Sequence, residues 1–125
     1  KGVYLGSSKG VFNGKIMVRQ DAQKIDAFQS NNNLLLSESS TIDSKPQLEI
    51  YADDVKCSHG CTIGQLDEDA LFYMRSRGIA VKEAKALLTY TFASEAIENI
   101  SIPEVKIVAQ KLLAKKLDVD LEFEL

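Results

Sequence analysis

The chain has 125 residues, of which 45% are hydrophobic and 26% charged, a composition typical of a soluble globular domain with a modest core. Its formal net charge is −3, and its basic residues are spread along the sequence, so neither nucleic acid nor a membrane surface is expected as a partner. No apolar run reaches the roughly 20 residues that a membrane-spanning helix needs.

The first residues, Lys1 to Tyr4, are not expected to belong to a signal peptide, because no long apolar stretch follows the initial charge. An initiating methionine is also missing, and we expect the sequence to begin inside a longer protein. Two cysteines without a secretory signal favour a reducing compartment, in which the thiols are free or bind metal. The sequence therefore predicts a cytoplasmic protein.

The first half of the chain, residues 1–66, alternates apolar and polar residues with the period of two that is typical of strands with one buried face. The apolar members are Ile16, Val18, Ile25, Ala27, Leu34, Leu36, Ile42, Leu48, Ile50, Val55, Cys57 and Ile63. Turn-forming residues separate them at Asn13-Gly14, Asp21, 30–33, 37–40, 43–46 and Asp53-Asp54. An antiparallel sandwich or barrel and a β-helix fit this pattern equally well.

The second half of the chain has the pattern of helices. Asp67 is a predicted N-cap, and Gly78 is a natural stop for a first helix. A second helix is expected from Val81 to about Glu98, and Pro103 fits the first turn of a third. The predicted apolar side of the third helix consists of Val105, Val108, Ala109, Leu112 and Leu113. Residues 118–125 are expected to form an added strand or a disordered end.

Catalytic motifs are absent from the sequence. The glycine-rich segment 6–10 lacks the spacing of a P-loop, and no G-x-S-x-G nucleophile motif occurs. A corner and a helix N-terminus account for the acidic groups Asp53-Asp54 and 67–69. We therefore expect no enzymatic activity from this chain.

One segment, 55–63, carries chemistry, because it holds both cysteines and the single histidine. If the segment is extended, one face carries Val55, Cys57, His59, Cys61 and Ile63. Two thiols and an imidazole suit a soft or borderline metal, although three ligands fall short of a closed zinc site and a second chain or solvent would have to complete the set. The alternative is packing, since the flanking Val and Ile indicate a buried face on which Cys acts as a small hydrophobe.

Five ordered segments carry a resemblance to a known family. They are Asp21 to Ala27, Asn33 to Ser37, Lys45 to Gly60, Gly64 to Asp69 and Arg75 to Ile79. These segments resemble the SufB/SufD family of iron–sulfur cluster assembly proteins over residues 10–79, and more loosely through the later helices. The run Lys56-Cys57-Ser58-His59-Gly60 is most similar to the SufD branch.

The resemblance implies a mainly β fold with a helical cap. Residues 1–66 are expected to be the carboxy-terminal coils of a right-handed parallel β-helix, or solenoid, and residues 67–125 a small helical subdomain that binds an ATPase partner. The implied function is that of a non-catalytic scaffold subunit of the SUF complex. It would pair with a SufB-type subunit through strands near the end of the core and bind a SufC-type ATPase with the helices at 67–77 and 81–98.

The resemblance also assigns roles within the segment 55–63. His59 matches the SufD histidine implicated in binding iron or a nascent cluster at the interface with SufB. Cys57 matches a cysteine with a less defined role. Cys61 stands where relatives often have a small residue such as Ala, which makes it the weakest candidate ligand. The implied cofactor is iron or a transient iron–sulfur cluster shared with SufB, and this chain alone is expected to hold none.

Two other functions remain open at this point. One is a small metal- or thiol-dependent domain that uses Cys57, His59 and Cys61, and the other is a purely structural β-solenoid adaptor. A truncated solenoid exposes an unpaired strand edge, and such edges associate readily with another chain. We therefore expect the isolated chain to self-associate as a homodimer through its terminal strands.

Overall fold

The computed structural model describes residues 1–119, which contain five strands and three helices. The strands are β1 (Gly2–Tyr4), β2 (Lys9–Val18), β3 (Ile25–Leu35), β4 (Thr41–Ile50) and β5 (Val55–Gly64). The helices are α1 (Glu68–Ser76), α2 (Val81–Glu98) and α3 (Pro103–Leu117). The strands belong to one compact unit, Lys1–Gln65, and the helices to a second unit that begins at Leu66. The predicted strand or loose end at 118–125 lies outside the described residues except for Asp118 and Val119.

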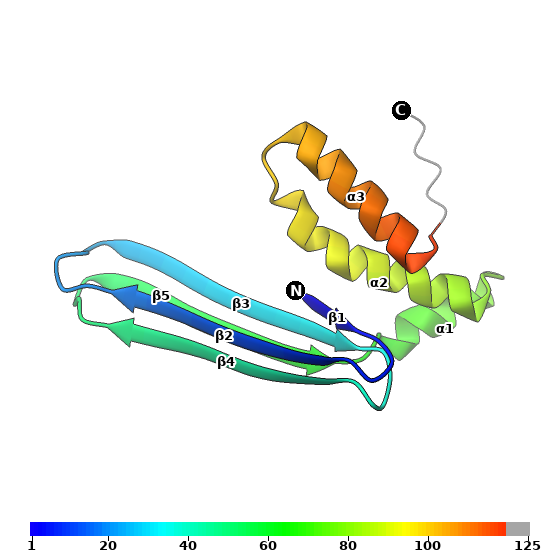
Figure 1. Ribbon diagram of the computed structural model, residues 1–125, viewed down its shortest axis with the longest axis horizontal. Coiled ribbons are helices and arrows are strands. Elements are labelled where there is room, and N and C mark those ends of the chain that lie inside the picture. Colours follow the sequence, from blue (N-terminus) through cyan, green and yellow to red (C-terminus); the bar gives the residue numbers. More distant parts are fainter. Residues whose placement is uncertain (120–125) are drawn as a thin grey trace. The chain divides into compact units, whose positions relative to one another are not determined.

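The strands form two sheets in which every pairing is parallel. One sheet has the order β1-β3-β5 and the other consists of β2 and β4, so that successive strands of the chain alternate between the sheets. Figure 1 shows β2 and β4 running in the opposite direction to β3 and β5. The antiparallel sandwich or barrel that the residue pattern left open is therefore wrong.

Three of the predicted turns are also wrong, because the strands are longer than the sequence pattern indicated. Asn13-Gly14 lies inside β2, segment 30–33 inside β3 and segment 43–46 inside β4. Pro46 is compatible with β4 because this strand lies at an edge, where a missing N–H interrupts no second ladder. The turns predicted at Asp21, 37–40 and Asp53-Asp54 are confirmed as connections between strands.

Polar side chains connect the two sheets. Asn31 Oδ1 accepts hydrogen bonds from Ser44 Oγ of β4 at 2.7 Å and from Asn33 Nδ2 at 2.8 Å. Asn31 and Asn33 are both buried. The odd-numbered residues of β3 near Asn31 therefore face the other sheet, and a polar ladder fills part of the space in which a corner was predicted.

The helical unit begins at the predicted cap. The Asp67 carboxylate accepts hydrogen bonds from the N–H groups of Asp69 at 2.9 Å and Ala70 at 3.2 Å, which stabilises the start of α1. Gly78, with a φ of +90°, follows the C-cap Arg77, and glycine adopts this left-handed conformation without steric cost. The predicted boundaries of the first helix are confirmed, as are Val81–Glu98 and the start of the third helix at Pro103. No helix within residues 1–119 is long and apolar enough to cross a membrane.

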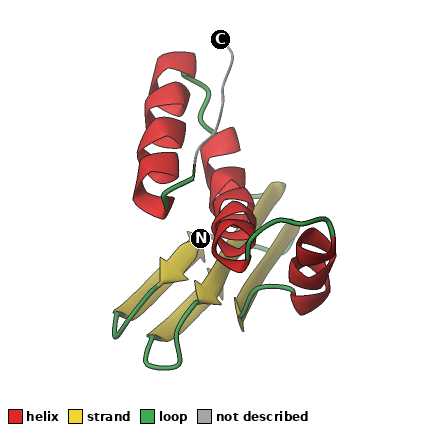
Figure 2. Ribbon diagram, turned by 90° about the vertical axis from the view of Figure 1, so that its right-hand side faces the viewer, coloured by secondary structure: helices red, strands yellow, loops and turns green. Residues whose placement is uncertain are grey.

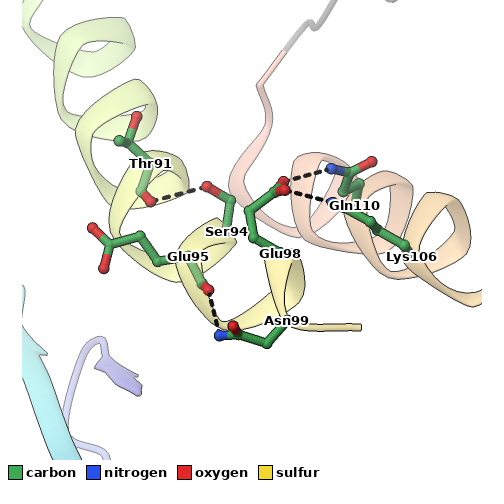
Figure 3. Close-up of polar contacts among 7 residues, drawn as sticks. All are labelled: Thr91, Ser94, Glu95, Glu98, Asn99, Lys106 and Gln110. Carbon is green, nitrogen blue, oxygen red and sulfur yellow. Dashed lines mark hydrogen bonds and ion pairs between the residues drawn. The ribbon is translucent and has the colours of Figure 1, made fainter. Parts of the chain in front are cut away.

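Helices α2 and α3 lie side by side in both views (Figure 1, Figure 2). The Glu98 carboxylate near the end of α2 accepts hydrogen bonds from Lys106 and Gln110 of α3 (Figure 3). The side of α3 that faces α2 therefore differs in part from the predicted apolar side. Of the predicted apolar side, Ala109 and Leu113 are half-buried, whereas three residues are exposed in this chain, namely Val105, Val108 and Leu112.

Candidate functional site

The candidate site lies on β5, an edge strand of the three-stranded sheet within the described residues. β5 pairs with β3 along its whole length, from Ile25↔Val55 to Leu34↔Gly64. Gly60 pairs with Ser30 in a continuous register, without a bulge. The segment 55–63 is therefore extended, which is the condition for Cys57, His59 and Cys61 to share one face.

The register places the three candidate ligands on one face of the sheet. Cys57 is paired with Ala27, His59 with Gln29, and Cys61 with Asn31. Paired residues of neighbouring parallel strands carry their side chains on the same face. Because the Asn31 side chain bonds to Ser44 of β4, this face of β3 and β5 is directed towards the second sheet.

The face is less covered on β5 than on β3. Cys57 is half-buried, but His59 and Cys61 are exposed, and Ile63 is 50% exposed. The packing interpretation predicted that the face with Val55, His59 and Ile63 would be buried. The structure contradicts this prediction, because His59 is exposed and Ile63 is half exposed. The reason is that no strand within residues 1–119 stacks on β5 in the way that β5 stacks on β3.

Strand geometry limits how these ligands can act together. Residues four apart in a strand are separated by about 13 Å, at about 3.3 Å per residue. A metal ion binds thiolate sulfur at about 2.3 Å, so Cys57 and Cys61 cannot bind the same ion. In residues 1–119 no group of three His, Cys, Asp or Glu side chains is close enough to hold a metal ion. The single-chain, three-ligand site therefore does not form, and His59 has at most one of the cysteines as a co-ligand.

One residue next to the site was missed by the sequence reasoning. Gln29, the register partner of His59, has a buried Oε1 atom without a hydrogen-bond partner. Its amide Nε2 lies against β2, where a Cβ atom added to Gly14 would be only 2.0 Å away. Polar residues alternate with apolar ones throughout this half of the chain, so nothing in the sequence distinguished Gln29 until the strand register was known.

The comparison with known proteins identifies the family. Residues 1–92 match the family model of the SufBD core domain of the SUF system for FeS cluster assembly. The chain belongs to the SufBD family.

The relatives extend this match to the helical unit. The iron–sulfur cluster assembly protein SufD of Escherichia coli (strain K12) is 46% identical over 115 residues, which cover 92% of this chain and 26% of the relative. SufD of Bacillus subtilis (strain 168) is 34% identical over 116 residues, or 93% of this chain and 26% of the relative. A SufBD family protein of Synechocystis is 46% identical over 99 residues, or 79% of this chain and 22% of the relative.

The predicted family resemblance is therefore confirmed, and the relatives include proteins named SufD. The chain spans about a quarter of the length of these relatives. The roles of His59, Cys57 and Cys61 are not tested by these matches and remain predictions.

Proposed function

We propose that this chain is the carboxy-terminal part of a non-catalytic, SufD-type scaffold subunit that works in cytoplasmic iron–sulfur cluster assembly. Residues 1–66 form the carboxy-terminal coils of its right-handed parallel β-helix. The subunit pairs with a SufB-type scaffold, and residues 67–125 bind a SufC-type ATPase. Membership of the SufBD family and the alternation of parallel strands between two sheets support this proposal.

The observation that carries the proposal is the exposure of His59 on the edge strand β5. A strand edge with unpaired N–H and C=O groups is a template for a strand of another chain. A partner strand added there brings its own side chains close to His59. Imidazole and thiolate are suitable ligands for iron, so His59, with Cys57 as a weaker co-ligand, supplies part of a site that the partner completes.

The helical unit offers a surface for the second partner. Phe72 and Tyr73 of α1 are 71% and 62% exposed, and neighbouring exposed aromatic residues are typical of surfaces that bind protein. These residues support α1 as part of the surface that the ATPase contacts.

The two alternatives are less well supported. An autonomous metal- or thiol-dependent domain requires several ligands in one place, and no group of three exists in residues 1–119. A purely structural adaptor predicts a fully packed His59, whereas His59 is exposed.

The test is the substitution His59→Ala in the complex assembled with SufB-type and SufC-type subunits. We expect a lower iron content per complex and a lower yield of clusters, with the complex itself still forming. Ser58→Ala is the matched control, because Ser58 is exposed on the opposite face of the same strand. Iron content and cluster yield equal to those of the unmodified complex would remove His59 from the proposed site.

A further inference from the structure

Gln29 and His59 are neighbours on the face of the sheet that is directed towards β2 and β4. They are paired in the register of β3 and β5, and neighbouring strands lie about 4.8 Å apart. Gly14 of β2 leaves room for the Gln29 amide, since any Cβ atom at Gly14 would overlap with Nε2. The end of the Gln29 side chain thus lies between the two sheets, on the strand next to that of His59.

The Gln29 amide has an unused acceptor. Its Oε1 atom is buried and has no hydrogen-bond partner. A buried carbonyl oxygen without a donor is unfavourable by about 1–3 kcal/mol, which is why such atoms are rare and usually have a role.

The other neighbours of His59 on β3 do not offer a free acceptor. Ala27, two residues before Gln29 on the same face, has no polar side-chain atom. Asn31, two residues after Gln29, uses its Oδ1 atom to accept hydrogen bonds from both Ser44 and Asn33. Asn33 Oδ1 is also buried without a partner, but Asn33 pairs with Ile63, four residues along β5 from His59. Gln29 Oε1 is therefore the unpaired side-chain acceptor on β3 that lies nearest to His59 in the register.

We propose that Gln29 is the positioning residue of His59. Its Oε1 atom, which is unpaired in this structure, accepts a hydrogen bond from a ring N–H of His59 when the ring turns towards β3, and this bond fixes one tautomer of the neutral imidazole. The lone pair of the other ring nitrogen is then directed away from β3, towards iron at the chain interface. This inference rests on the proposed function, because it assigns the residue that orients the proposed ligand.

The physical basis is general for histidine ligands. A metal-bound imidazole usually donates its second N–H to a carboxylate, a carbonyl or a water, and this bond sets both the tautomer and the orientation of the ring. An amide oxygen serves this purpose without adding charge to a partly buried site. Loss of such a partner usually weakens metal binding about 10- to 100-fold.

The first test needs neither metal nor partner. His59 is the single histidine of the chain, so ¹⁵N-histidine labelling gives one imidazole, whose tautomer is read from two-bond ¹⁵N–¹H spectra. At pH 9, where a free imidazole is neutral, we expect one dominant tautomer in the unmodified 125-residue chain. Gln29→Met and Gln29→Ala should both give a mixture of tautomers. Gln47→Met, an exposed amide on the outer face of β4, is the matched control and should change nothing.

The second test measures affinity for Co²⁺ in the assembled complex. Gln29→Met should weaken Co²⁺ binding by about tenfold or more, whereas Gln29→Glu, which keeps an acceptor oxygen, should not. Tautomer populations that are the same in the unmodified chain and in both apolar variants would overturn this inference and leave the proposed function intact. Conversely, the unmodified chain could show one tautomer that depends on Gln29 while the His59→Ala complex keeps its full iron content. That result would overturn the proposed role of His59 in binding iron, but not the orientation of its ring by Gln29.

Discussion

Glu98 and Lys106 form an ion pair that joins the last turn of α2 to the first turns of α3 (Figure 3). The same carboxylate also accepts a hydrogen bond from Gln110 Nε2 at 3.3 Å. The Lys106 side chain is 29% exposed and the Glu98 side chain 57%. The side of α3 that carries Lys106 and Gln110 therefore faces the end of α2.

The negative charge of Glu98 also affects Tyr90, and this leads to a prediction about pH. Burial, and to a smaller extent the charge of Glu98, raise the pKa of Tyr90 above its ordinary value of 10.0. Unfolding lowers that pKa, so Tyr90 has no influence on pH dependence well below pH 10 and reduces the free energy of unfolding as the pH rises above it. Tyr90→Phe should make the decline above pH 10 less steep in denaturant unfolding experiments. Tyr73→Phe, at an exposed tyrosine, is the control, and an equal effect of both substitutions would contradict the assignment.

The N-cap of α1 gives a second prediction. Asp67→Ala removes the acceptor for the N–H groups of Asp69 and Ala70, and we expect a loss of about 1 kcal/mol in the free energy of unfolding. Asp67→Asn keeps a capping oxygen and should cost much less. Thermal and urea unfolding followed by circular dichroism measure both variants. Equal stability of the Ala and Asn variants would show that the cap is unimportant.

The close approach of β2 to Gln29 gives a third prediction. In Gly14→Ala, the new methyl group would lie 2.0 Å from Gln29 Nε2 and 2.7 Å from the Phe12 ring, so that both side chains must shift, and we expect a destabilisation of about 1 kcal/mol from overpacking. Gly64→Ala is the matched control, because no atom lies within 4 Å of its added Cβ. That substitution should be neutral or stabilise by less than about 1 kcal/mol. If urea midpoints shift equally for the two variants, the Gln29 amide is not held where the structure has it.

The exposed edge of β5 gives a fourth prediction. The isolated chain should self-associate, and Ile63→Lys should shift it towards the monomer, because charged residues on an edge strand oppose pairing with another strand. Ile63 is 50% exposed, and Ile102, which is 56% exposed at the start of α3, allows Ile102→Lys as the control. Sedimentation velocity over a range of concentrations measures both. A strictly monomeric unmodified chain at high concentration would contradict this prediction.

The helices were predictable from the sequence because their signals are local. The Asp67 carboxylate caps N–H groups two and three residues away, and Gly78 and Pro103 act at their own positions. The apolar side of α3 was only partly predictable. Lys106 and Gln110 contact Glu98 of α2, which lies 8 and 12 residues earlier, and apolar periodicity does not contain that information.

The strands were less predictable because their partners are distant. Asn31, Asn32 and Asn33 pair with residues 61–63 of β5, 30 residues later, and this pairing keeps the asparagine run extended although asparagine favours turns. The same distance hid Gln29, whose relation to His59 exists only in the register of β3 and β5. The alternation at 55–63 correctly placed Cys57, His59 and Cys61 on one face. It did not indicate that this face of β5 would be exposed at His59.

The most direct test of the central claim is pulsed electron paramagnetic resonance of the iron-loaded, reduced complex in which only this chain carries ¹⁵N-histidine. Because the chain has a single histidine, any ¹⁵N coupling to the iron comes from His59. We predict that the ¹⁴N couplings of a bound imidazole are replaced by ¹⁵N couplings when this chain alone is labelled. Spectra that show no effect of the label would mean that His59 is not an iron ligand.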